Sequence, residues 1–127
     1  MIKFLKIIFH ISTLFLIIIS IYPGSLLGYL LYGDSGQQPN LVQNPFGTSI
    51  NHFAYFIYVS LLGLFLHLRT KNFQKLLYGL FFLSVILELL HLIIPNRSFQ
   101  LVDLIANIFG VMVAYFIVKF YLFLSRS

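Results

Sequence analysis

The sequence contains no cysteine, and only three of its 127 residues are acidic. The absence of cysteine excludes disulfide bonds, catalytic thiols and thiolate metal sites. So few acidic residues also exclude a di-iron centre of the helix-bundle type, which takes carboxylates from several helices. The chain has no phosphate-binding loop, nucleophile elbow or dinucleotide fingerprint. It therefore lacks the local motifs of nucleotide-binding enzymes and serine hydrolases.

The residues that are present make the chain strongly apolar. Hydrophobic residues account for 60% of it, charged residues for 9%, and the mean hydropathy is +0.97. A soluble domain of this composition would expose large apolar patches, so the lipid bilayer is the expected solvent. The net charge is +5, but the basic residues flank apolar segments and form no patch with interleaved aromatic side chains. We predict a single membrane domain over residues 1–127 that does not bind nucleic acid.

Four apolar segments predict four transmembrane helices and an all-α fold. They cover residues 4–22, 50–68, 76–94 and 101–124. Each is close to the ~20 residues that a helix needs to cross a hydrocarbon core of ~30 Å. The fourth segment can span the core despite its two charged residues, because Lys119 can extend its amine towards one surface and Asp103 can lie near the opposite head groups.

The distribution of Lys and Arg predicts the orientation of these helices. Basic residues precede the first segment, lie between the second and third, and flank the end of the fourth: Lys3, Lys6, Arg69, Lys71, Lys75, Lys119 and Arg126. The other two connections contain only Arg97. The positive-inside rule therefore places both termini in the cytoplasm.

The first segment also has features of a secretory signal peptide, because Lys3 and Lys6 precede it and small residues follow at Ser25 and Gly28. Cleavage would leave three spans, and we expect the segment to be retained. Pro23 and Gly24 predict a helix end, with a short interfacial piece over residues 26–32. Residues 33–44, rich in Gly, Gln, Pro and Asn, predict an external loop.

Polar residues near the predicted outer ends of the last three helices form the candidate site. An ionised group at the centre of a lipid-facing helix costs about 3 kcal/mol on insertion scales, so such residues usually pair or serve a function. Glu88 lies about 9 Å below the predicted outer end of its helix, and His91 lies one turn above it on the same face. The predicted topology brings six polar residues together: His52, Glu88, His91, Arg97, Asp103 and Asn107.

Gly110 and Ala114 continue the face of Asp103 and Asn107 along the fourth segment. Small residues four apart let a neighbouring helix approach closely. We assign these two residues to helix packing, with no chemical role.

The polar residues admit structural and chemical interpretations. Arg97 could bridge Glu88 and Asp103 in an ion-pair cluster that closes the bundle. Glu88 and His91 also have the i, i+3 spacing of helix-bundle metal ligands, and a single zinc ion with help from His52 and Asp103 is conceivable. With so few acidic ligands, the sequence favours no metal and no cofactor.

Several of these residues follow one another in a recognisable order within residues 50–116. They are His52, Phe53, Phe56, Glu88, Pro95, Arg97, Asp103, Asn107 and Gly110. In this order the chain resembles the VanZ-like family of small bacterial membrane proteins, whose pattern is His-Phe-x-x-(Tyr/Phe), Glu-x-x-Gln, Pro-Gly-Arg and Asp-x-x-x-Asn-x-x-Gly-x-x-x-Gly. Three positions differ: His91 replaces the Gln, Asn96 the first Gly and Ala114 the last.

The resemblance implies an integral protein of the bacterial plasma membrane. A family with Gln at the position of His91 does not need an imidazole ligand there. The founding member is associated with low-level resistance to teicoplanin, and most relatives have no assigned activity. Nothing in the residues above points to an antibiotic, so resistance is not carried over to this chain.

We expect the polar cluster to bind a lipid head group or a membrane partner, such as another protein or a second copy of the chain. Arg97 would contact an anionic group, because its guanidinium has the charge and planar fork that suit phosphate. An alternative is a membrane enzyme acting on a lipid-linked substrate, with Glu88 or His52 as general base. A proton-coupled carrier that uses Glu88 is a further alternative and would require a dimer, since transporters are commonly built from repeats.

Overall fold

Four long helices and one short helix make up most of this computed structural model, which describes residues 1–39 and 44–126. The helices are α1 (Ile2–Ile21), α2 (Leu26–Tyr32), α3 (Ser49–Leu66), α4 (Phe73–Leu89) and α5 (Leu101–Leu124), and one turn of 3-10 helix (Leu90–Leu92) extends α4. The described residues contain no strand. Part of the predicted external loop, residues 40–43, lies outside the described residues.

The four long helices are each long and apolar enough to cross a membrane. Their spans are Ile2–Ile21, Ser49–Leu66, Phe73–Leu92 and Leu101–Leu124, with lengths of 20, 18, 20 and 24 residues. The first three start one to three residues earlier than the sequence predicts, and the fourth has the predicted limits. The predicted all-α bundle of four transmembrane helices is confirmed.

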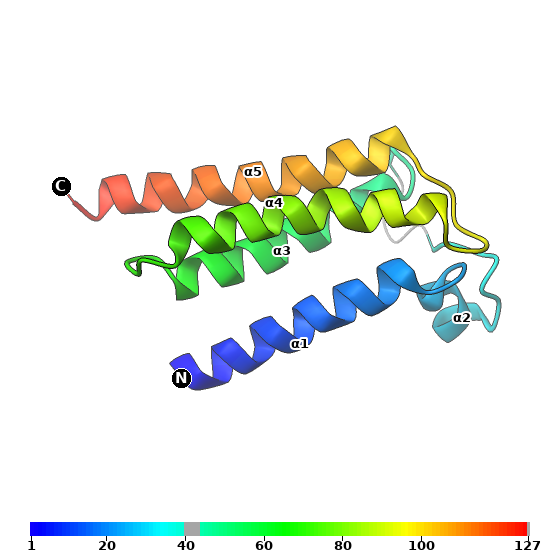
Figure 1. The fold of residues 1–127 in the computed structure, drawn as a ribbon, viewed down its shortest axis with the longest axis horizontal. Coiled ribbons are helices and arrows are strands. Elements are labelled where there is room, and N and C mark those ends of the chain that lie inside the picture. The colour runs from blue at the N-terminus through cyan, green and yellow to red at the C-terminus, as the bar shows by residue number, and fades with distance from the viewer. Residues whose placement is uncertain (40–43, 127) are drawn as a thin grey trace.

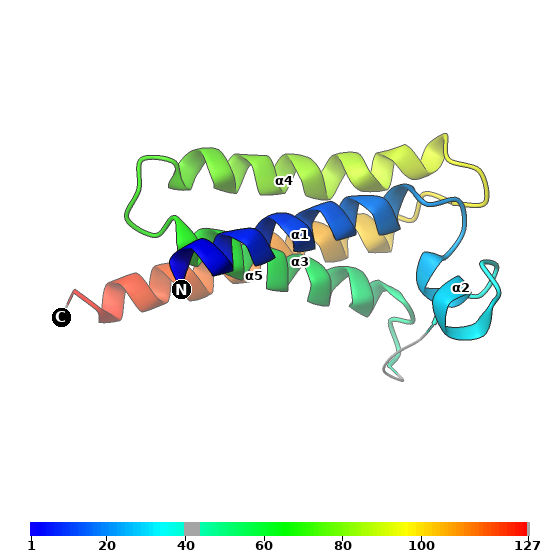
Figure 2. The same cartoon turned by 90° about the horizontal axis from the view of Figure 1, so that it is seen from below.

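Helices α3, α4 and α5 run side by side, and α1 packs against α3 and α4 (Figures 1 and 2). The closest approach is between α3 and α5. At Gly110 of α5, a Cβ atom would lie only 2.8 Å from the backbone oxygen of Phe53 and 2.9 Å from the Cβ of Phe56. Ala114, one turn further along, is completely buried. The absence of side-chain bulk at Gly110 therefore lets the two backbones meet.

Helix α1 ends where the sequence predicts. Tyr22 is extended after Ile21, and Gly24 has a φ of +87°, a conformation that glycine adopts readily. The hydroxyl of Ser25 then accepts a hydrogen bond from the N–H of Gly28 and caps α2. The predicted short piece over residues 26–32 coincides with α2, and its backbone is tied to the following loop by a bond from the N–H of Ser25 to the oxygen of Ser35.

Long apolar side chains cover the outward faces of the bundle. Phe82 is 69% exposed, Phe116 61% and Phe120 63%. Water would solvate such a surface poorly, whereas acyl chains are as apolar as these side chains. The exposed faces therefore fit a bilayer.

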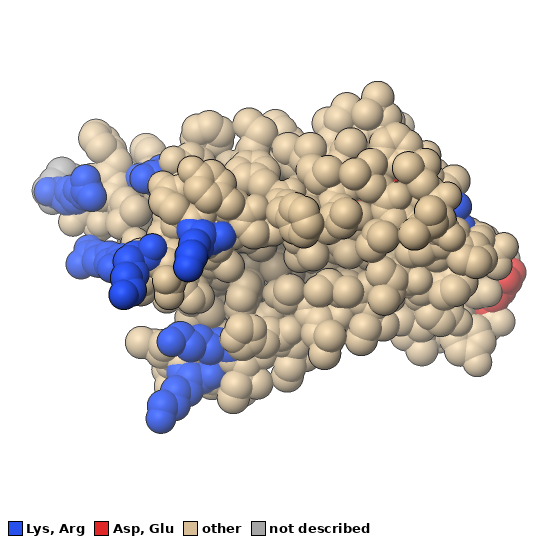
Figure 3. All heavy atoms as spheres, viewed as in Figure 1, with Lys and Arg blue, Asp and Glu red and all other residues tan. Residues whose placement is uncertain are grey.

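Charge separates the two ends of the bundle. Lys and Arg gather at the end that carries both termini and the α3–α4 connection, which we call the basic end (Figure 3). The opposite end carries α2 and the α4–α5 connection, and we call it the α2 end. The positive-inside rule predicts that the basic end faces the cytoplasm, so the cytoplasmic placement of both termini stays a prediction.

Candidate functional site

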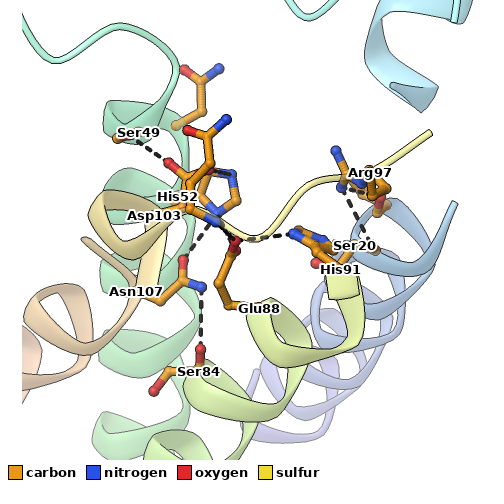
Figure 4. Close-up of polar contacts among 12 residues, drawn as sticks. Ser20, Ser49, His52, Ser84, Glu88, His91, Arg97, Asp103 and Asn107 are labelled. Carbon is orange, nitrogen blue, oxygen red and sulfur yellow. Dashed lines mark hydrogen bonds and ion pairs between the residues drawn. The ribbon is translucent and has the colours of Figure 1, made fainter. Parts of the chain in front are cut away.

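Buried polar side chains from α3, α4 and α5 meet inside the α2 end of the bundle (Figure 4). Glu88 is completely buried, and Asn107, His91 and Asp103 are 1%, 4% and 5% exposed. The His52 side chain is 15% exposed. We call His52, Glu88, His91, Asp103 and Asn107 the polar cluster. They come from chain segments up to 55 residues apart, so only the packing of the helices unites them.

Glu88 lies in the last turn of α4, at the centre of the polar cluster. Its Oε1 accepts a hydrogen bond of 3.0 Å from the backbone N–H of Gln100, at the start of α5, and lies 3.2 Å from the Nδ1 of His91. Its Oε2 is buried, has no hydrogen-bond partner among the described residues, and lies 4.0 Å from the Nδ1 of His52. One carboxylate oxygen is therefore held by the protein and the other is free.

His91 connects Glu88 to α1. The tighter 3-10 turn that follows α4 carries its ring. The Nε2 of His91 lies 2.9 Å from the backbone oxygen of Ser20. Because a carbonyl only accepts, Nε2 must be the donor. Both ring nitrogens of His91 are therefore engaged, one by Ser20 and one by Glu88.

Asp103 lies in the first turn of α5, where the helix dipole favours a negative charge. Its Oδ1 accepts a hydrogen bond of 2.5 Å from the hydroxyl of Ser49, the first residue of α3. Its Oδ2 lies 3.6 Å from the Nε2 of His52, beyond ordinary hydrogen-bond length.

Asn107 fixes the orientation of His52. The side-chain amide of Asn107 donates a hydrogen bond of 3.2 Å to the backbone oxygen of Ser84. The amide oxygen must then face His52, whose Nδ1 lies 3.1 Å away. Since this oxygen only accepts, Nδ1 of His52 donates the bond and carries a hydrogen. The Nε2 of His52 is left to face Asp103.

Arg97 lies beside the polar cluster and bonds to α1. Its Nη2 donates to the backbone oxygens of Ile19 and Ser20, at 3.1 and 3.3 Å. In the described part of the chain, the acid–base contacts within 4.0 Å join Glu88 and Asp103 to histidines, which are charged only when protonated, rather than to Arg97. The proposed Arg97 bridge between the two carboxylates is thus not the arrangement seen.

The backbone before Arg97 explains its direction. Asn96 has a φ of +58°, which reverses the chain after Pro95. The reversal carries the guanidinium to the end of α1, whose last carbonyls lack helical partners and attract a cation. Burial lowers the pKa of Arg97 from its ordinary value, while the negative charges of Glu88 and Asp103 act in the opposite direction. Arginine remains charged throughout the physiological range.

A polar pocket of about 350 Å³ opens beside the cluster at the α2 end. It is lined by the α2 loops, by the α4–α5 connection and by three residues named above, His52, His91 and Asp103. Arg97 lines this pocket and also a smaller apolar crevice, of about 80 Å³, between α1, α2 and α3. The polar cluster is therefore accessible from one side.

Among the contributors to the site that sequence reasoning missed are three polar groups. Ser20 supplies a backbone acceptor, Ser49 a hydroxyl donor and Gln100 a backbone donor. Ser49 alone carries a recognisable signal, because a serine at the start of a helix often has a polar role. The two backbone groups could not be identified by residue type.

Comparison with known proteins identifies the chain. The family described as VanZ/LLP1 matches residues 9–124. The chain belongs to the VanZ/LLP1 family. The match includes most of α1, which lies outside the residues 50–116 that carry the motif resemblance. No curated protein and no solved structure matches the chain.

The VanZ-like motif residues map onto the site of this VanZ/LLP1 protein. His52, Glu88, Asp103 and Asn107 belong to the polar cluster, and Arg97 lies beside it. Asn96 stands where the family pattern has glycine, and its φ of +58° explains that pattern, because Gly and Asn adopt this conformation most easily.

Proposed function

We propose that this VanZ/LLP1 protein binds an anionic lipid head group in the pocket at the α2 end, with Arg97 as the charged contact. The observation that carries the proposal is the position of Arg97. Its Nη2 is satisfied by α1, but its Nε is buried and has no hydrogen-bond partner in the part of the chain that the structure describes. A buried donor without a partner loses free energy that a bound phosphate oxygen would restore.

The surroundings of Arg97 suit a lipid more than a small soluble anion. The polar pocket has the volume of an ordinary ligand site. The apolar crevice that shares Arg97 with it is lined by Leu16, Ile19 and Leu26. A head group in the pocket and the start of an acyl chain in the crevice would contact both at once. The apolar outer surface of the bundle supports contact with membrane lipids beside this opening.

Replacing Arg97 by alanine tests the proposal. We expect the affinity for phosphatidylglycerol to fall about 10- to 100-fold, since a hydrogen bond to a charged group is worth about 1.5–3 kcal/mol. Native mass spectrometry of the purified protein, titrated with phosphatidylglycerol or phosphatidylcholine, measures the effect. Arg97→Lys keeps the charge but loses the planar fork, so its affinity for phosphatidylglycerol should lie between those of the wild type and Arg97→Ala.

Arg69→Ala is the matched control, because Arg69 is exposed at the basic end. It should leave the affinity for phosphatidylglycerol unchanged. An Arg97→Ala protein that is folded and still binds phosphatidylglycerol as tightly as the wild type would refute the proposal. Competition by inorganic phosphate alone, without preference for the lipid, would assign the pocket to a free anion instead.

A further inference from the structure

Three residues of the polar cluster share one feature: each has one polar atom held by the protein and a second atom without a hydrogen bond to any described residue. In His52, Nδ1 is held by Asn107. In Asp103, Oδ1 is held by Ser49. In Glu88, Oε1 is held by the backbone of Gln100 and by His91. The atoms left over are Nε2 of His52, Oδ2 of Asp103 and Oε2 of Glu88.

These three residues come close enough to share one ion. One nitrogen or oxygen atom from each lies within 4.8 Å of the others. The Nε2 of His52 and the Oδ2 of Asp103 are 3.6 Å apart. That separation is long for a hydrogen bond, yet two ligands of a tetrahedral ion with bonds of ~2.0–2.1 Å lie about 3.4 Å apart.

Glu88 supplies the independent indication that something binds here. Its Oε2 is completely buried and has no hydrogen-bond partner within residues 1–39 and 44–126, although the side chain points towards His52 and Asp103 (Figure 4). A buried carboxylate oxygen without a partner is costly. A cation between the three residues would satisfy that oxygen and balance the charges of both carboxylates.

We propose that His52, Glu88 and Asp103 bind one divalent metal ion of the zinc class. An imidazole and two carboxylates suit zinc and its first-row neighbours better than Mg²⁺ or Ca²⁺, which prefer oxygen ligands alone. Zinc would take three protein ligands and leave one coordination position open. His52 and Asp103 both line the polar pocket, so the open position faces the pocket.

The groups that hold these three side chains form the outer shell of hydrogen bonds that metal ligands usually have. A ligating histidine commonly donates its other N–H to an oxygen, and ligating carboxylates are themselves hydrogen-bonded. Asn107 performs the first role for His52, and Ser49 and Gln100 perform the second for Asp103 and Glu88. The ligands are therefore already oriented by the fold.

This ligand set differs from the Glu88 and His91 pair that helical spacing suggests. Both nitrogens of His91 are engaged, by Ser20 and Glu88, so His91 supports Glu88 and is not a ligand. The glutamine that the family pattern has at this position is therefore compatible with the proposed metal site. A glutamine side chain can also donate a hydrogen bond to Glu88.

Metal titration of the full-length protein in detergent tests the proposal, with zinc and cobalt ions as probes. Chelator-treated wild-type protein should bind one equivalent of Zn²⁺ in isothermal titration calorimetry. Bound Co²⁺ should give visible absorption bands of low coordination number without thiolate charge-transfer bands, because the chain has no cysteine. His52→Gln and Asp103→Asn should each weaken Zn²⁺ binding more than about 100-fold, and Asn107→Ala about 10- to 100-fold.

His10→Gln is the matched control, because His10 is exposed on α1, far from the cluster in sequence. It should retain the wild-type Zn²⁺ affinity. Circular dichroism and gel filtration identify any variant that fails to fold. Absence of stoichiometric Zn²⁺ binding by the wild type would overturn the proposal. The proposal would also be overturned if the folded His52→Gln and Asp103→Asn proteins bound Zn²⁺ as tightly as the wild type. No lipid is added, so the outcome is independent of the lipid proposal.

Discussion

Glu88→Ala is expected to lower the free energy of unfolding by about 2–5 kcal/mol, because each of the two buried groups left without its partner costs about 1–3 kcal/mol. Glu88 is completely buried, and its carboxylate satisfies the N–H of Gln100 and the ring of His91. Without it, both groups would be buried with no acceptor. Unfolding of the purified protein in mixed micelles with increasing dodecyl sulfate measures the change.

Ser60→Ala is the control for Glu88→Ala. Ser60 is also completely buried on α3, but its hydroxyl has no hydrogen-bond partner in the described part of the chain. Its removal should change the free energy of unfolding by less than about 1 kcal/mol, because no bond is lost. If Glu88→Ala proved as stable as Ser60→Ala, the network around Glu88 would not hold the α2 end together.

Gly110→Ala is expected to lower the free energy of unfolding by about 1–3 kcal/mol, the range for overpacking a well-packed core. The added methyl group would lie 2.8 Å from the backbone oxygen of Phe53 and 3.1 Å from the backbone nitrogen of Ile57. Backbone atoms cannot turn aside as a flexible side chain can. Helices α3 and α5 would therefore have to separate, and the same micelle titration detects the loss.

Gly79→Ala provides the same chemical change at a site with space. Gly79 also lies within a helix, α4, but a Cβ there would meet no neighbouring atom of the described residues within 4 Å. We expect its stability to equal or exceed that of the wild type by up to about 1 kcal/mol, because alanine favours helix more than glycine does. Equal stability of Gly110→Ala and Gly79→Ala would contradict close contact between α3 and α5.

Hydropathy was sufficient to predict the long helices, because the bilayer requires about 20 apolar residues for each span. The short helix α2 was also predictable, from Pro23 and Gly24. The ends of the spans differ from the predicted ends by up to three residues, because hydropathy does not define the last turn. The 3-10 turn that orients His91, for example, lies within an apolar run that the sequence describes as continuous helix.

The grouping of the cluster residues followed from topology, but their pairing did not. Charge alone suggested that Arg97 would join Glu88 and Asp103. The φ of Asn96 instead turns Arg97 towards the carbonyls of α1. Residue types do not reveal a backbone acceptor such as that of Ser20, so this partner could not be predicted. Because Arg97 turns away, both carboxylates have histidines as their basic neighbours.

Both proposals place positive charge around one pocket. Arg97 lines the pocket from the α4–α5 connection, and a metal ion held by His52 and Asp103 would face it from the bundle. Phosphate groups bind to both kinds of centre. Either proposal can fail without the other, because Arg97 makes no contact with the three proposed ligands within ion-pair distance.

The whole site depends on Asn107, which orients His52 so that its Nε2 faces Asp103 and the pocket. Nitrogen-15 NMR of protein labelled at histidine tests this most directly, with the His52 signals assigned by their loss in His52→Gln. We predict that the Nδ1 of His52 carries a hydrogen, whereas a neutral histidine ring in water more often carries its hydrogen on Nε2. We also predict that these signals change in Asn107→Ala. A bare Nδ1 in the wild type, with signals unaffected by Asn107→Ala, would contradict the proposed arrangement.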